Sequence, residues 1–543
     1  IDITCVGVMA PAVAHVKATI PRDAKGESIG SPLDFRYEWD FGDPAGQYNK
    51  LPGWNAAHIY DRPGKYTVTL TVRGPGGKTY TRSTWVRVAP DSRARVHVSA
   101  DGNDAFDGST PQRAVRSPGR AMQLAKGEAY VLFRRGDTFD ISGSFGVHGQ
   151  GLRLGAYPRG SAPETSPVLR KVPGPPRSES MFVIGAKAAD VMAENLTFDS
   201  SWDLKNPEFG SKKIPARAFT VGGTNFAARW CLFRNLTDAM NTEMKPTGVM
   251  VQGCIFTDEI RGYGVYCNGQ DFAIVGNLMG QSRQEHMIRA TEPGVTRILV
   301  AYNDLRRTNM IKGSLELRMA SWFTVACNYF NGGTCRIGPQ EQDKGQYPNW
   351  KEIKCEWGVV QDNRLDDLFI NVRLGTNHMI VRNNVIRLNK DAKEFDWAII
   401  LACEKPGYDD VRKVADVRVE DNTVINLGTR GKMLLVQGKP VGITVKRNVY
   451  VAPHVTDENA SGVQLTAGDA TGVQAIEGNV WPAGRGGVPR FGKNAVDPAK
   501  WQDGNVVKNE RFGAVPFDED DNVPIATGAG ALLGNDRRQR EKK

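Results

Sequence analysis

A short motif recurs through most of this 543-residue chain and constrains its fold more than any other feature. It appears as WCLF, GCIF, GNLM, YNDL and CNYF. Its second residue falls at Cys231, Cys254, Asn277, Asn303 and Asn328, at steps of 23, 23, 26 and 25 residues, and returns less evenly at Asn363, Asn384, Asn422, Asn448 and Asn479. Steps of this size are typical of the coils of a parallel β-solenoid.

The segments that precede the motif support this interpretation. They are rich in Val and Ile, as in FAIVG, RILVA, FTVAC, MIVRN, VRVED and GITVK, which favours buried strands. Asn side chains stacked from coil to coil can also hydrogen-bond along the column. The pattern predicts about ten coils in one domain over residues 95–505, and a capping segment and tail over 506–543.

Residues 1–90 follow a different pattern. YEWDFGD (37–43), HIYDRPGKYTVTLTV (58–72) and YTRSTWVRV (80–88) alternate like strands between Gly, Pro and Asp turns, which indicates a small β-sandwich. The WDFGD run, the pair His58 and Tyr60, and Pro63-Gly64 before VTLTV resemble the polycystic-kidney-disease (PKD) immunoglobulin-like domain. The resemblance implies a non-catalytic spacer or a polysaccharide-binding module.

The segment between these two regions predicts the start of the solenoid. Over 95–139 a strand, an Asp/Gly/Asn turn, a short helix near 117–126 and a second strand follow in order. This order resembles the amino-terminal end of right-handed parallel β-helices in secreted polysaccharide-active proteins. We therefore expect an all-β chain, a β-sandwich followed by a right-handed parallel β-helix, whose first coil is covered by that helix.

Charge and composition limit the partners. A net charge of +10 and a pI near 9.1 suit a polyanion, whether nucleic acid, an acidic membrane surface or an acidic polysaccharide. No segment is long and apolar enough to span a bilayer. The chain begins IDITCVGVMA, without Met or a signal-peptide pattern, which we interpret as a processed start of a secreted, cell-surface or periplasmic protein.

The eight cysteines give no metal signature. No CxxC pair occurs, which argues against a structural zinc site. We expect most of the cysteines to be buried free thiols. Cys335 and Cys355 flank a loop and are a candidate disulfide.

The stretch IKGSLELRM (311–319) shows where chemistry is expected. Gly313, Leu315, Leu317 and Met319 share one face of an extended strand, and Lys312, Ser314, Glu316 and Arg318 share the other. A β-helix has a packed interior, so a site must lie on such an outward face. A solvated face would show the same alternation, so the strand alone does not decide between the two.

Neighbouring coils carry further outward candidates. Coils stack about 4.8 Å apart, so outward arginines of successive coils are predicted to form a cationic column. The arginines are Arg289, Arg318, Arg336 and Arg373, with Tyr266, Asn268, Glu285, His286, Glu316 and Asn371 beside them. The alternative is an Arg–Glu ladder on a solvated face, where surface ion pairs contribute little.

Residues 285–333 resemble the chondroitinase B and alginate lyase family of β-helix lyases. KGSLELRM (312–319) and CNYFNGG (327–333) match that family's motifs, which implies that Arg318 is the catalytic arginine. The family's base lysine lies on the preceding coil, where MIRAT has Arg289 or Ala290 instead. Lys312 would lie roughly 20 Å from Arg318 on a straight strand, at about 3.3 Å per residue.

Lyase chemistry explains these residue types. The enzyme removes the proton beside a uronate carboxylate, so Arg or a divalent cation must neutralise the carboxylate and a base of lowered pKa must take the proton. Tyr266, His286, Arg289 and Lys312 are the candidate bases. Glu285 and Glu316 are either arginine-orienting groups or Ca²⁺ ligands, and no other cofactor is indicated. Asn268, Glu285, Glu316, Arg336, Asn371 and Arg373 are the candidate substrate-binding residues.

We therefore expect a secreted, monomeric polysaccharide lyase that cleaves a uronic-acid-containing polymer by β-elimination and binds no nucleic acid. Two alternatives remain. One is a glycoside hydrolase that uses a carboxylate pair, either Glu285 with Glu316 or Glu316 with an Asp or Glu of the loop 338–356. The other is a non-catalytic protein whose arginines grip an anionic glycan.

Overall fold

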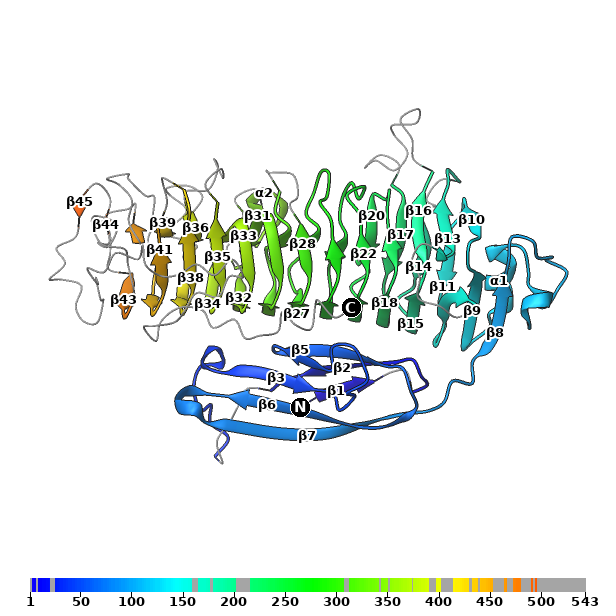
Figure 1. The fold of residues 1–543 in the computed structure, drawn as a ribbon, viewed down its shortest axis with the longest axis horizontal. Coiled ribbons are helices and arrows are strands. Elements are labelled where there is room, and N and C mark those ends of the chain that lie inside the picture. The colour runs from blue at the N-terminus through cyan, green and yellow to red at the C-terminus, as the bar shows by residue number, and fades with distance from the viewer. Residues whose placement is uncertain are drawn as a thin grey trace. The chain divides into compact units, whose positions relative to one another are not determined.

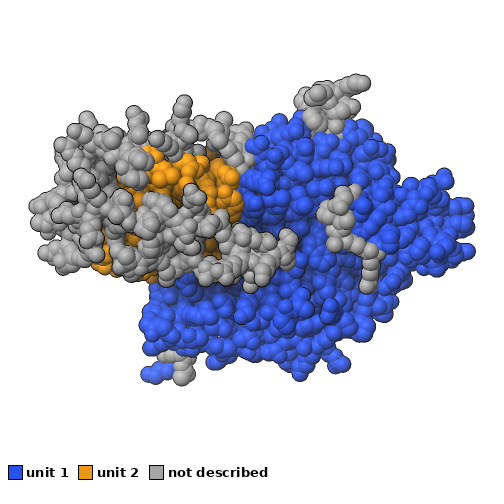
Figure 2. Space-filling view, in the orientation of Figure 1, with its two compact units in different colours: residues 1–314 blue, residues 315–543 orange. Residues whose placement is uncertain are grey.

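The structure is a computed structural model of the chain. It describes residues 2–5, 8–19, 25–158, 165–175, 179–201, 215–306, 312–340, 343–349, 352–373, 375–389, 397–401, 414–428, 432–437, 440–452, 463–465, 472–479, 490–491 and 494–495. The chain divides into two compact units, Ile1–Ser314 and Leu315–Lys543, coloured separately in Figure 2. The predicted segment 506–543 lies outside the described residues.

Unit 1 begins with the predicted β-sandwich of two antiparallel sheets (Figure 1). Tyr37 and Trp39 point into its core because β3 alternates inward and outward residues, and Phe41 and Tyr60 are buried with them. One sheet has the order β1-β2-β5 and the other β4-β3-β6-β7. Their strands are β1 Asp2–Cys5, β2 Ala12–Lys17, β3 Arg36–Asp40, β4 Lys50–Pro52, β5 Asn55–Tyr60, β6 Gly64–Arg73 and β7 Thr79–Val88.

The rest of unit 1 is a parallel β-helix, as predicted. One parallel sheet contains β8 Ala94–Val98, β9 Ala129–Arg134, β12 Arg153–Tyr157, β15 Ala189–Glu194, β18 Thr224–Arg229, β21 Thr247–Gln252, β24 Gln270–Val275 and β27 Thr296–Ala301. The facing strands are β10 Thr138–Ile141, β11 Phe145–Val147, β13 Val168–Lys171, β14 Ser180–Ile184, β16 Thr197–Ser200, β17 Arg217–Val221, β19 Leu232–Phe233, β20 Asp238–Asn241, β22 Ile255–Phe256, β23 Val265–Cys267, β25 Leu278–Met279, β26 Ile288–Ala290 and β28 Asp304–Arg306.

The predicted helix near 117–126 is confirmed as α1, Pro118–Leu124. The Ser117 side chain caps it by accepting a hydrogen bond from the backbone N–H of Arg120, and Pro118 stands at a first-turn position that needs no N–H donor. α1 packs against β8, the first strand of its sheet.

Unit 2 continues the same architecture. One parallel sheet contains β30 Ser321–Ala326, β32 Cys355–Gln361, β34 Thr376–Arg382, β37 Ala415–Glu420, β40 Ile443–Lys446 and β43 Val473–Glu477. The other strands are β29 Leu315–Leu317, β31 Tyr329–Ile337, β33 Arg364–Val372, β35 Val385–Leu388, β36 Trp397–Leu401, β38 Thr423–Asn426, β39 Lys432–Val436, β41 Val449–Val451, β42 Val463–Leu465, β44 Arg490–Phe491 and β45 Asn494–Ala495. The short helix α2, Asp343–Gln346, follows β31.

The recurring motif forms the predicted column of asparagines. In unit 1 the Asn277 amide donates to Asn303 Oδ1 at 2.9 Å. In unit 2 the same bond links each asparagine to the next at 2.9–3.0 Å, through Asn328, Asn363, Asn384, Asn422, Asn448 and Asn479. Because these side chains are almost fully buried, the column satisfies polar groups that water cannot reach.

The predicted disulfide between Cys335 and Cys355 is wrong. Both are free thiols, as are the other described cysteine side chains, Cys231, Cys254, Cys267 and Cys327. Cys335 lies on β31 and is fully buried, and burial raises the pKa of its thiol to about 12. The Cys355 thiol lies 3.5 Å from the carbonyl oxygen of Leu317, which it reaches as a donor. The expectation of buried free thiols is confirmed for these residues except Cys327, which is a free thiol but only half-buried.

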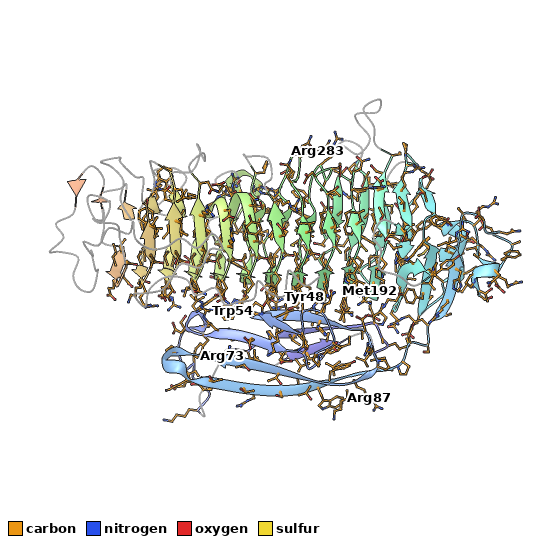
Figure 3. The ribbon with its side chains drawn as sticks, viewed as in Figure 1. Tyr48, Trp54, Arg73, Arg87, Met192 and Arg283 are labelled. Atoms are coloured by element: carbon orange, nitrogen blue, oxygen red, sulfur yellow. The ribbon has the colours of Figure 1, made fainter. Side chains whose placement is uncertain are left out.

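Within unit 1 the sandwich packs against the coils. Strand β5 contacts β24 and β27 (Figure 1). The Asn55 amide donates to the Phe272 carbonyl at 3.0 Å, and the Tyr48 ring lies 5.8 Å from the Tyr302 ring. Figure 3 shows Tyr48 between the sandwich and the coils and Arg87 on the opposite side of the sandwich.

Among the described residues no helix has the length and hydropathy needed to cross a membrane.

Candidate active site

Three adjacent strands of unit 1 present the first group of candidates. The register places Tyr266 between Asn241 and Arg289 on β20, β23 and β26. Val265 and Cys267 point inward and are fully buried, so the neighbouring Tyr266 faces outward as predicted. The same alternation along β26 turns Arg289 outward.

The Glu285 carboxylate joins two cations. Its Oε2 lies 3.2 Å from Lys312 Nζ and 3.5 Å from Arg289 Nη1. Lys312, which the sequence placed only by its distance from Arg318, therefore lies close to Arg289 through this shared carboxylate. The Lys312 side chain is 32% exposed, whereas that of Glu285 is nearly buried.

The loop that carries Glu285 is fixed by short local bonds. The Glu285 N–H donates to Ser282 Oγ at 3.0 Å, and that hydroxyl donates to the Gly262 carbonyl at 2.6 Å. Gly262 is required here, since a Cβ at this position would lie 2.5 Å from Asp238 Oδ1. Arg283, on the same loop, lies at the edge of the coils away from the sandwich (Figure 3).

Tyr263 belongs to the site, although the sequence did not reveal it. Arg289 Nη1 donates to its hydroxyl, and the guanidinium lies 5.2 Å from the centre of its ring. The Tyr263 ring is also 5.2 Å from that of Tyr266. Tyr263 and Tyr266 are three residues apart, so on a regular strand they would point to opposite faces. Tyr263 lies before the start of β23, however, and its backbone N–H donates to Asp238 Oδ1 at 3.0 Å.

Both tyrosines are held in the protonated form. Burial raises the pKa of Tyr266 to about 12, and burial likewise raises the pKa of Tyr263. The Tyr266 hydroxyl lies 3.0 Å from Thr291 Oγ1 and donates to Glu292 Oε1 at 3.1 Å. The expectation that nearby cations lower a tyrosine pKa is wrong here, because desolvation outweighs the charge of Arg289.

Two other predicted residues of this group face the protein rather than solvent. His286 is 1% exposed, and the backbone N–H of Gly313 donates to its Nδ1 at 2.9 Å. Met287 and Ile288 beside it are also buried, so no alternation turns His286 outward. Asn268 is buried as well, at the end of β23.

The second group of candidates lies in unit 2, around Glu316. Its Oε2 is 3.2 Å from Arg318 Nε, and its Oε1 is 3.2 Å from Arg373 Nη1. Glu316 is 0% exposed and Arg318 is 4% exposed. The predicted open polar face of this strand is therefore wrong, although its apolar face is confirmed by the buried Leu315 and Leu317.

Gln340 and Asp343 cover this group, and the sequence had pointed here only to an unspecified Asp or Glu of the loop 338–356. Asp343 Oδ1 accepts from Arg318 Nη1 at 3.1 Å, and the Gln340 amide donates to Glu316 Oε1 at 2.8 Å. The Gln340 N–H also donates to Asp343 Oδ2 at 2.7 Å. The sequence did not link these two residues specifically to Glu316, because both follow β29 by more than twenty positions.

Arg336 and Asn371 stand in register with Glu316 on β29, β31 and β33. The predicted column of arginines at matching positions is therefore wrong, because Arg336 aligns with Glu316 and not with Arg318. Arg336 is half-buried. Within unit 2 the arginines alternate with carboxylates, because Glu316 lies between Arg318 and Arg373. The pairing of arginine with glutamate matches the predicted Arg–Glu ladder, but these side chains are buried and do not lie on a solvated face.

The carboxylates do not form a cation cage. Both oxygens of Glu316 face arginine or amide donors, and Glu285 faces Arg289 and Lys312. Over the part of the chain that the structure describes, no group of three or more His, Cys, Asp or Glu side chains is arranged to hold a metal ion. These two glutamates fit the role of arginine-orienting groups better than that of Ca²⁺ ligands.

Comparison with known proteins identifies the first domain. Residues 7–88 match the family model of the PKD domain. The β-sandwich of this chain is a PKD domain. No curated protein sequence matches the chain.

Solved structures similar to this chain are β-helix proteins that differ in activity. They include the GH136 lacto-N-biosidase from Eubacterium ramulus (14% identity, 71% of this chain and 67% of that one, TM-score 0.39), the Family 28 exopolygalacturonase of Yersinia enterocolitica (11%, 84% and 99%, 0.44) and a variant of a PL6 family alginate lyase (11%, 77% and 58%, 0.35). Similarity at this level concerns the fold alone.

Proposed function

We propose that the chain is a polysaccharide lyase that cleaves a uronic-acid-containing polymer by β-elimination. The observation that carries the proposal is the Glu285 carboxylate, which holds Arg289 and Lys312 together beside two protonated tyrosines. The Arg289 cation suits the uronate carboxylate, and a protonated phenol suits the departing oxygen. The net charge of +10 supports an anionic substrate.

Of the four candidate bases, Lys312 fits best once the other three are considered in turn. Arg289 hardly deprotonates. His286 is buried, and its Nδ1 is engaged by the backbone of Gly313, whose N and O both lie 2.9 Å away. The raised pKa of Tyr266 makes it a poor base at neutral pH. Lys312 is partly exposed and has a side chain able to act once deprotonated.

Each group then has one role. The neutral amine of Lys312 takes the proton beside the carboxylate, which Arg289 neutralises. The electron pair left behind forms the carbon–carbon double bond, and the glycosidic oxygen departs. Tyr266 donates its hydroxyl proton to that oxygen, and proton exchange with solvent restores both groups.

A glycoside hydrolase is less well supported. Its general acid must be a protonated carboxyl group. Glu285 and Glu316 each face two cationic partners, which stabilise the ionised carboxylate. The remaining alternative is a glycan-binding protein without catalysis, which would need the same cationic side chains to bind an anionic glycan.

A panel of acidic polysaccharides tests the proposal. The unsaturated uronyl product of a lyase absorbs in the ultraviolet, so an absorbance increase during digestion supports it. New reducing ends without that absorbance would indicate a hydrolase, and binding without cleavage would indicate a binding protein.

Variants of Lys312 test the mechanism. We expect Lys312→Ala and Lys312→Arg to lose at least about a hundredfold in kcat, because arginine keeps the charge but cannot serve as the base. Lys446→Ala is a matched control, since Lys446 also lies near a glutamate, at 3.1 Å from Glu477, and is 31% exposed. Full activity in Lys312→Arg would show that Lys312 only neutralises charge.

A further inference from the structure

His15 occupies the contact between the PKD domain and the coils of unit 1. It lies on β2 of the sheet whose strand β5 contacts β24 and β27, and its side chain is almost fully buried. A Cβ on Gly248 would lie 3.1 Å from His15 Nε2, so the imidazole rests directly on the backbone at β21. Gly248 has a φ of 79°, which glycine adopts without strain.

Two neighbours of the ring favour its charged form, the Asn225 side chain and the Asp271 carboxylate, but desolvation outweighs both. Among the described residues neither ring nitrogen of His15 is within hydrogen-bond geometry of a partner. The Asn225 amide lies alongside but donates to Asp190 Oδ1 at 3.1 Å. The acidic group that acts on the ring is Asp271, whose carboxylate is already paired with Arg297 at 2.5 Å.

The other elements around His15 add no negative charge that could stabilise an imidazolium. Its backbone partners are Thr4 on β1 and Ala57 on β5, and neither side chain titrates in the relevant range. Lys17, two residues further along β2, is itself cationic and pairs with Asp2 at the exposed edge. A protonated His15 would therefore be a buried charge whose nearest carboxylate, Asp271, is already paired with Arg297, which is unfavourable.

The rest of the contact includes separated polar contacts. Asp61 Oδ1 lies 2.6 Å from Arg229 Nη1, and Arg153 Nη2 donates to the Pro11 carbonyl at 3.0 Å. Such a contact can open while each side stays folded, because each side has its own core, such as Trp39 in the sandwich.

We propose that the PKD domain is a reversible cover on the coils, released when His15 is protonated in acid. The inference does not depend on the proposed lyase activity. Burial lowers the pKa of His15 from 6.5 to about 4, chiefly through desolvation. The docked state therefore binds fewer protons than the open state between these values, so docking is strongest above pH 6.5 and weakens as the pH falls to about 4.

The size of the effect follows from the same shift. A difference of about 2.5 pKa units between the open and docked states corresponds to about a 300-fold change in the docking equilibrium. Asp61 and Asp190 also form ion pairs near this contact, so the contribution of His15 must be isolated by substitution.

Hydrogen exchange of the intact chain tests the proposal. Backbone amides of β5 and β24 should lose protection as the pH falls from 7 to 4, after correction for the intrinsic exchange rate, while the core strands of both parts keep theirs. His15→Gln cannot titrate, and we expect it to remove most of this pH dependence. His97→Gln is the control, since the pKa of His97 is also lowered by burial but its ring contacts the Gly108 carbonyl within the first coil.

Two results would overturn the proposal. One is an equal pH response in the wild-type and His15→Gln chains. The other is a titration of His15 near its ordinary pKa in the intact wild-type chain, measured by exchange of the imidazole C2 proton, which remains informative even if His15→Gln fails to fold.

Discussion

Arg318 and Lys312 lie six residues apart in one stretch of sequence, but their side chains have different surroundings. Arg318 is covered and paired with Glu316 and Asp343, whereas Lys312 reaches solvent beside Glu285. The family resemblance implied that Arg318 is the catalytic arginine, and this role remains a prediction. Its burial adds a structural role that the alternation of the strand did not indicate.

Substitution of Arg318 should destabilise the chain. In Arg318→Ala the buried carboxylates of Glu316 and Asp343 lose a cationic partner, and breaking a buried ion pair typically costs about 3–5 kcal/mol. We expect a lower midpoint of denaturant unfolding. Arg170→Ala is the control, because its pair with Asp140 is exposed and should change the midpoint little. A wild-type midpoint for Arg318→Ala would mean that water already solvates these carboxylates.

The asparagine column is the device that holds successive coils together in unit 2. Each buried amide donates both to the next asparagine and to a strand carbonyl, as Asn384 does to Asn422 at 2.9 Å and to Val360 at 3.0 Å. In unit 1 a thiol takes the same position at Cys254, where it reaches the Ala228 carbonyl at 3.5 Å. Asparagine and cysteine therefore occupy the same position of the motif, but the thiol makes weaker hydrogen bonds than the amide.

This difference predicts unequal costs of substitution. Asn384→Ala leaves the donors of Asn363 and the carbonyl of Val360 without partners, and we expect a loss of at least about 2 kcal/mol in the free energy of unfolding. Cys254→Ala removes only a weak thiol contact and should cost less. Calorimetry or denaturant titration compares the two. An equal loss in both variants would show that packing, and not hydrogen bonding, maintains the column.

At the scale of the whole molecule, the PKD domain covers part of the solenoid. Outward residues of β21, β24 and β27 are apolar and fully buried at Met250, Ala273 and Leu299. An outward sheet face of this kind would normally be solvated and polar. Its composition is explained by the sandwich strand β5, which contacts β24 and β27.

Removal of the PKD domain should therefore affect the coils. A shortened chain that begins near residue 92 exposes Met250, Ala273 and Leu299, so we expect lower solubility and a lower melting temperature. Turnover of short oligosaccharides should persist in the fraction that stays folded, since Lys312 and Glu285 lie outside the removed segment. Size-exclusion chromatography and a melting curve measure both effects. An unchanged melting temperature would show that the two parts are thermodynamically independent.

The sequence by itself determined the architecture. The regular recurrence of the asparagine slot predicted the coils, and WDFGD with its strand neighbours predicted the PKD domain, because both depend on short-range patterns of turns and alternation. The same alternation correctly placed Tyr266, Arg289 and Glu316 on the non-core side of their strands.

Only the tertiary structure decided which of these side chains meet water and which neighbours they have. Glu316 is covered by Gln340, which follows it by 24 positions, and Tyr263 turns toward Arg289 at a bend before its strand. The buried His15 likewise depends on a partner surface far along the chain. Alternation assigns a side chain to a face, but burial and pairing arise from segments that return from elsewhere in the sequence.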